Sequence, residues 1–230
     1  MGKGTGGYSS IRSVTVASFF AVSFAAHGGV TEWDAHLRKG QVEYDRGDYQ
    51  RATASLNAAV KEAEAFGETD ERLPLTLSIV ASKYLSGGDY AAAEPLLKRS
   101  LAIRKKILGP DHPDVAKTMN NLATLRIAQR KYDEAEPLLR GSLEINEKVL
   151  GRDHPDVATG VDNLAILCGV QGKYAQAESL FKRAIAIWKK MGDAQNLAMS
   201  MKNMETLHVN MKGEAVLPSF SLGVHSRDVR

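Results

Sequence analysis

The sequence contains a single cysteine, Cys168, among its 230 residues. One cysteine excludes an intramolecular disulfide and a zinc site built on cysteines. It does not indicate whether the protein lies in an oxidising or a reducing compartment. The sequence also has little excess of either sign of charge. It contains 30 Lys and Arg and 27 Asp and Glu, for a formal net charge of +3. The two signs alternate along the predicted helices, which is typical of solvated faces and argues against nucleic-acid binding.

Motifs for catalysis or cofactor binding are missing as well. We find no nucleophile motif, no glycine-rich phosphate loop and no metal-ligand spacing outside two repeated helix starts. The six histidines are scattered along the chain. We therefore predict that the protein is not an enzyme and that it holds no cofactor and no metal.

No apolar run is long enough to predict a stable membrane span. The most apolar one, residues 14–26, is shorter than the roughly 20 residues that a transmembrane helix needs. Lys3 and Arg12 precede it, and the small residues Ser23 and Ala25 lie near its end, as in a secretory signal peptide. We predict that the protein is exported, to the periplasm or beyond the cell. The alternatives are an uncleaved anchor, or a cytoplasmic protein whose start codon is assigned too far upstream.

What the chain does contain is one stretch of sequence written twice. The second copy begins at Tyr132, 42 residues after Tyr90, and segments 88–129 and 130–171 are identical at 23 of 42 positions. A third copy begins at Tyr174. A fixed period of this size indicates a solenoid, in which each repeat is one supersecondary unit that buries its apolar face only against its neighbours.

Within each repeat the apolar spacing is helical and is interrupted by turn residues. Residues 33–66 fit two antiparallel helices with a break at Gly47 and Asp48, and the next pair breaks at Gly87 and Gly88. Two further pairs are predicted over about 114–149 and 156–191. A ninth helix, 194–211, repeats the first half of a unit, and we predict that it caps the end of the stack. The predicted division of the chain is a signal peptide at 1–26, the solenoid at 31–211 and a flexible C-terminal tail at 212–230.

The residues that recur are mostly those that stacked helices require. Ala81, Ala123 and Ala165 place small side chains where helix backbones approach each other, and a larger side chain there would overpack the core. Pro95 and Pro137 lie inside second helices, where we expect a bend or a loosened first turn and not a break.

The duplicated DHPDVA has two readings. Asp111, His112 and Asp114 are good metal-ligand types, but they also suit a helix start, where a side chain caps free amides and proline fits the first turn. A metal site needs convergent ligands, whereas the two copies are displaced by a whole repeat. We favour the helix start.

Together, LG-x-DHPDVA, NNLA, Y-x-x-AEPL and the 42-residue period resemble the tetratricopeptide repeat, and in particular the kinesin-light-chain subgroup. The resemblance covers residues 31 to about 211. It implies an all-α fold, a right-handed α-solenoid of stacked antiparallel helix pairs with about four repeats plus the C-terminal capping helix. Arg126 and Cys168 depart from the pattern, because the family usually has an aromatic residue there.

The resemblance also implies where a partner binds. In the family, peptides lie on the concave surface made by the first helix of each pair, held by asparagines, and Asn121, Asn163 and Asn203 match these. The alternative is that each asparagine bridges adjacent repeats or caps a backbone group. The residue before each asparagine, together with a lysine and a threonine, is expected to face the same groove. The predicted peptide-binding residues are Lys117, Asn120, Asn121, Thr124, Asp162, Asn163, Lys202 and Asn203.

The leading functional hypothesis is a non-catalytic interaction module that binds an extended segment of a protein or peptide partner. Lys117, Arg126 and Lys202 would give the groove a mildly basic lining suited to a peptide with an acidic group, although Asp162 interrupts it. The alternative is a structural or self-associating adaptor that uses the solenoid ends or the tail, particularly residues 217–222.

Overall fold

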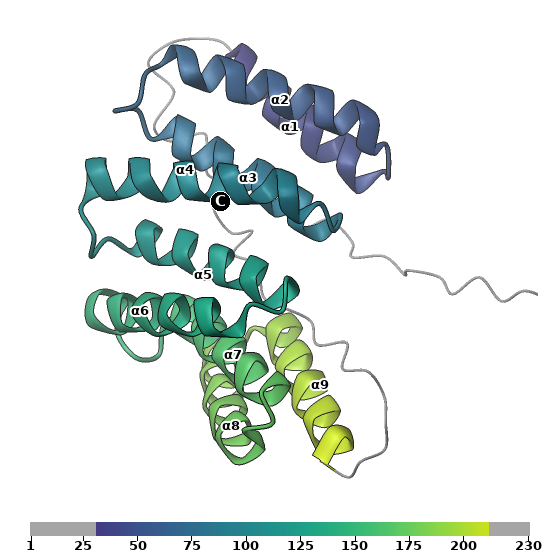
Figure 1. The fold of residues 1–230 in the computed structure, drawn as a ribbon, viewed down its shortest axis with the longest axis vertical. Helices are drawn as coiled ribbons and strands as arrows, with labels where there is room; N and C mark the ends of the chain where they lie inside the picture. Colours follow the sequence, from purple (N-terminus) through teal and green to yellow (C-terminus); the bar gives the residue numbers. More distant parts are fainter. Residues whose placement is uncertain (1–30, 212–230) are drawn as a thin grey trace, which may run out of the picture.

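The computed structural model describes residues 31–211, and this part of the chain is built from helices alone. Consecutive helices form antiparallel pairs that stack on one another (Figure 1). The predicted all-α solenoid with a C-terminal helix is confirmed. The predicted signal peptide and C-terminal tail lie outside the described residues. The helices are α1 (Glu32–Asp45), α2 (Tyr49–Ala65), α3 (Arg72–Ser86), α4 (Tyr90–Leu108), α5 (Pro113–Ala128), α6 (Tyr132–Leu150), α7 (Pro155–Val170), α8 (Tyr174–Met191) and α9 (Ala194–Met211).

The repeated helix starts are capped by histidine. The residue before α5 is His112, in an extended conformation, and its Nδ1 accepts a hydrogen bond of 3.1 Å from the Asp114 amide. Its copy His154 accepts one of the same length from the Asp156 amide at the start of α7. Each ring satisfies one of the free amides that begin a helix. The helix-start reading of DHPDVA is therefore confirmed.

Small residues lie where the helices approach most closely. Ala81, Ala123 and Ala165 are completely buried, as are Ala93 and Ala135 in the second helices. A solenoid has no central core, so its apolar side chains form successive clusters along the stack, each shared by neighbouring helices.

The odd-numbered helices form one side of the stack. From α3 onward they contact one another in succession, α3 with α5, α5 with α7 and α7 with α9. Among the helices described, no contact of comparable extent joins α2 to α4, α4 to α6 or α6 to α8. The repeats therefore lie closest together on the side formed by the odd-numbered helices, which we call the inner surface. This agrees with the expectation that the first helix of each pair lines the concave face.

The two internal prolines do not end their helices. Pro95 lies inside α4, which continues to Leu108, and Pro137 lies inside α6, which continues to Leu150. Each proline falls near the start of its helix, where the hydrogen bond it removes belongs to the first turns. The expectation that these helices are not broken is confirmed.

Two helical glycines are expected to respond oppositely to substitution by alanine. A Cβ on Gly160 would meet only the Leu143 side chain, with Cδ1 at 3.7 Å, whereas a Cβ on Gly40 would lie 2.7 Å from Leu56 Cγ and 3.1 Å from its backbone nitrogen. We expect Gly160→Ala to raise the free energy of unfolding by about 0.5–1 kcal/mol, since glycine is costly inside a helix. Gly40→Ala should lower it by about 1–3 kcal/mol through overpacking. Urea unfolding of both variants tests this, and a loss of stability in Gly160→Ala would contradict it.

Candidate interaction surface

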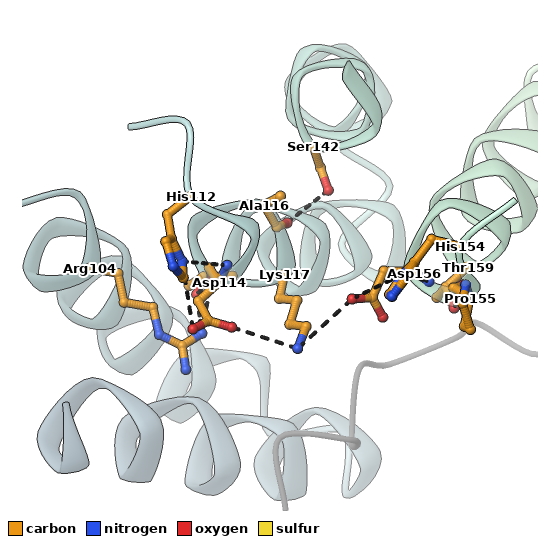
Figure 2. A network of polar contacts seen from close by, with 11 residues as sticks. Arg104, His112, Asp114, Ala116, Lys117, Ser142, His154, Pro155, Asp156 and Thr159 are labelled. Atoms are coloured by element: carbon orange, nitrogen blue, oxygen red, sulfur yellow. Dashed lines mark hydrogen bonds and ion pairs between the residues drawn. The ribbon is translucent and has the colours of Figure 1, made fainter. Parts of the chain in front are cut away.

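Lys117 links two successive helix starts on the inner surface. Its ammonium lies 3.6 Å from an Asp114 carboxylate oxygen at the start of α5 and 3.9 Å from an Asp156 oxygen at the start of α7. Figure 2 shows the lysine pointing between the two aspartates, each of which lies beside its capping histidine. Acidic groups at helix N-termini are favoured by the helix dipole, and here they also hold the lysine. Lys117 therefore joins adjacent repeats and keeps about a fifth of its side chain exposed.

Two of the predicted asparagines bind each other. The Asn163 amide nitrogen on α7 donates to the Asn120 amide oxygen on α5 over 3.2 Å, and both side chains are fully buried. Thr124, one turn after Asn120, donates to the Asn120 carbonyl oxygen over 3.1 Å and is also buried. This pair bridges adjacent repeats, which is the alternative that the sequence left open.

Asp162, like Asn120, does not line the predicted groove. Its carboxylate is 3% exposed, and its Oδ2 accepts hydrogen bonds from the Trp188 indole on α8, at 2.8 Å, and from the Ser200 hydroxyl on α9. Burial raises the pKa of the Asp162 carboxyl to about 6, although the two hydrogen bonds lower it in part. The expectation that Asn120, Thr124 and Asp162 face the groove was wrong, because all three side chains are held inside the stack.

The remaining predicted residues are divided between the interior and the surface. Asn121 and Asn203 are buried, with 1% and 2% exposure, at the same register of α5 and α9 as Asn163 on α7. Lys202, the residue before Asn203, is exposed. Peptide binding by any of the predicted residues stays a prediction.

Arg126 is not part of a basic groove lining. Its side chain is 7% exposed, and its guanidinium binds both Glu94 oxygens of α4 at 2.9 Å. Its Nε lies 2.8 Å from Glu134 on α6, and its Nη1 donates to the Gln129 amide oxygen over 2.7 Å. The arginine that replaces an aromatic residue thus joins three helices through one cation. Its hydrogen bonds, followed by one from Lys98, hold the pKa of Glu94 far below its usual range.

Cys168, the equivalent residue one repeat later, behaves as a small apolar side chain. It is 3% exposed and packs in the cluster that contains Phe181 and Leu207. Burial raises the pKa of its thiol, which disfavours the reactive thiolate.

Several interior polar contacts were not predicted from the sequence, because each joins residues of different helices. Ser142 donates to the Ala116 carbonyl oxygen over 2.8 Å (Figure 2), and Ser100, 42 residues earlier, donates to the Pro74 carbonyl oxygen over 2.7 Å. Trp188 stands at the register of Arg104, whose Nη1 donates to the Thr118 hydroxyl over 2.8 Å. Comparing the repeats position by position would have found the recurring serines.

Among residues 31–211, no group of three or more His, Cys, Asp or Glu side chains is placed to hold a metal ion. None of the helices between these bounds combines the length and the apolar character needed to cross a membrane.

The stacked helix pairs define an α-solenoid repeat protein, a class whose fold generally mediates protein–protein interaction. The tetratricopeptide repeat model matches three overlapping segments of the chain, 34–106, 72–140 and 114–190. The chain therefore belongs to the tetratricopeptide repeat family, and the predicted family is confirmed.

Solved structures share this fold at low sequence identity. BtubC (BKLC) from P. vanneervenii superposes with a TM-score of 0.59 at 21% identity, over 80% of this chain and 82% of that one. A putative kinesin light chain with nearly identical TPR-like repeats, from Podosopora anserina, gives 0.60 at 18% identity, over 80% and 100%. Aspartyl phosphate phosphatase F from Bacillus subtilis gives 0.68 at 16% identity, over 80% and 47%. No curated protein matches the chain.

Proposed function

We propose that the protein is a non-catalytic scaffold whose inner surface binds an extended segment of a partner protein. The observation that carries this proposal is the unbroken succession of contacts among α3, α5, α7 and α9, which makes one continuous surface from several repeats. An extended chain is the ligand shape that fits such a surface, because each repeat offers it the same register of contacts.

Two lysines mark where this surface is open to a ligand. Lys117 lies between the starts of α5 and α7, and Lys202 is exposed on α9. Asn121, Asn163 and Asn203 lie at one register of α5, α7 and α9, but they are buried, so a ligand would contact their amides only after these side chains rearranged. The exposed Lys202 would favour a segment with an acidic group.

The binding test compares two double variants that change the same charge. Peptides are first selected from a displayed random library with the full chain. Their affinities are then measured by calorimetry for Lys117→Ala/Lys202→Ala and for the control Lys105→Ala/Lys189→Ala, whose two exposed lysines lie on the second helices α4 and α8. We expect the first variant to lose at least about tenfold in affinity, equivalent to about 1.4 kcal/mol, and the control to change by less than about twofold. Equal losses, or none in either variant, would place binding elsewhere.

Self-association through the C-terminal end is disfavoured by one residue. Glu205 on α9 stands at the register that Ala165 occupies on α7, and it is exposed where Ala165 is completely buried. Another helix packed there would have to bury a carboxylate without a partner. The self-associating adaptor would therefore have to use another surface, and solution mass across a dilution series separates it from a monomeric scaffold.

A further inference from the structure

Asp162 is a buried acid at the junction of the last three helices. It belongs to α7, and its Oδ2 accepts from Trp188 of α8 and from Ser200 of α9. Its Oδ1 is buried and has no hydrogen-bond partner among the residues described. One carboxylate oxygen thus links the capping helix to the preceding repeat. Both hydrogen bonds that it accepts come from neutral donors.

The charged groups on the surrounding helices are engaged elsewhere or point to solvent. On the inner side, Asp156 of α7 pairs with Lys117 of α5. Lys190 of α8 pairs with Asp153, outside this junction. On α9, Lys202 is exposed and His208 lies 3.8 Å from Glu178 of α8. Desolvation raises the pKa of Asp162, the hydrogen bonds from Ser200 and Trp188 lower it in part, and no charged side chain is among the causes.

Because Oδ1 is enclosed, the cation best able to reach it is a proton. A neutral carboxyl in this place leaves one O–H without an acceptor, which costs far less than a buried carboxylate without a counter-charge. When α9 leaves the junction, the carboxylate meets water and regains an ordinary pKa. Docking of α9 and protonation of Asp162 therefore favour each other.

We propose that protonation of Asp162 controls how tightly the capping helix α9 docks on α7 and α8, with α9 held most tightly in acid and most loosely at neutral pH. Since α9 carries Lys202 and Asn203, the same proton would govern the C-terminal end of the peptide-binding surface. Only this last step rests on the proposed function.

The expected pH dependence of α9 docking follows from the difference in the Asp162 pKa between the docked and undocked states. The docked pKa is raised to about 6, so the docked state binds more protons at every pH between about 4 and 6. Docking strengthens as the pH falls through that range and levels off below it. Between pH 7 and pH 5 the docking equilibrium should change by about tenfold.

Hydrogen exchange of the full chain tests the proposal without any partner. We expect the backbone amides of residues 197–211, corrected for the intrinsic pH dependence of exchange, to be about tenfold better protected at pH 5 than at pH 7. The amides of α4, far from the junction, serve as the internal control and should change by less than about twofold. Equal protection of α9 at the two pH values would overturn the proposal, as would an equal change in α4.

Two variants assign the effect to Asp162. Asp162→Asn keeps an oxygen acceptor for Trp188 and Ser200 but cannot titrate, so the protection of α9 should no longer depend on pH. Ser200→Ala removes one donor and keeps the acid, so the pH at which protection falls should rise. A wild-type pH response in Asp162→Asn, or a lower midpoint in Ser200→Ala, would contradict the proposal. None of these outcomes bears on whether the inner surface binds a peptide.

Discussion

Replacing Trp188 by alanine is expected to lower the free energy of unfolding by about 3–5 kcal/mol, the range found when large buried aromatic side chains are removed. The indole is 2% exposed and packs against Val157, Val161 and Ala184, which belong to α7 and α8. Its Nε1 also donates to Asp162, so the variant leaves a buried carboxylate with one donor fewer. Equilibrium unfolding in urea, followed by circular dichroism, measures the loss.

Trp188→Phe is the matched control, because it retains an aromatic ring and removes the indole N–H. We expect it to lose less than half as much stability as Trp188→Ala. Since each repeat of a solenoid contacts only its neighbours, hydrogen exchange in the alanine variant should increase most in α7, α8 and α9 and least in α1 and α2. A loss below about 1 kcal/mol would show that the surrounding side chains collapse into the space.

Replacing Arg126 by leucine is expected to lower the free energy of unfolding by about 2–4 kcal/mol. Breaking an ion pair by removing one partner costs about 3–5 kcal/mol when the pair is fully buried, and somewhat less here because the Glu94 side chain keeps 24% of its exposure. Leucine keeps an apolar side chain at this buried position but leaves Glu94 and Gln129 without their main donor. The matched control is Glu134→Gln, whose carboxylate is 55% exposed and whose loss should cost less than about 1 kcal/mol.

The same cluster predicts how stability depends on pH. The pKa of Glu94 is held low in the folded protein, chiefly by hydrogen bonds from Arg126, so the folded state binds fewer protons than the unfolded one at acidic pH. This stabilisation is complete above the ordinary glutamate pKa and is lost as the pH falls below it. Wild-type stability should therefore decline below about pH 4.5 more steeply than that of Arg126→Leu. Parallel pH profiles would show that Glu94 is not the group responsible.

The candidate surface was predicted less well than the fold, and particular residues show why. Asn163 was identified from its place in the repeat, but its hydrogen bond to Asn120 of the neighbouring repeat was not specified by the sequence. Arg126 was assigned to a basic groove, whereas Glu94, 32 residues earlier in the chain, neutralises it. In both cases the residue type and the register were read correctly. The error was in the contacts, which depend on how one repeat is rotated against the next.

What the sequence by itself determined is the arrangement of helices. The 42-residue period, the capped starts at His112 and His154 and the small residues at Ala123 and Ala165 each depend on short-range hydrogen bonding or on apolar spacing within one repeat. Only the tertiary structure decided which polar side chains are enclosed. Asp162 meets Trp188 and Ser200, 26 and 38 residues away, because three separate helices converge there. Such distant meetings are set by side-chain packing between repeats, which no local pattern in the chain encodes.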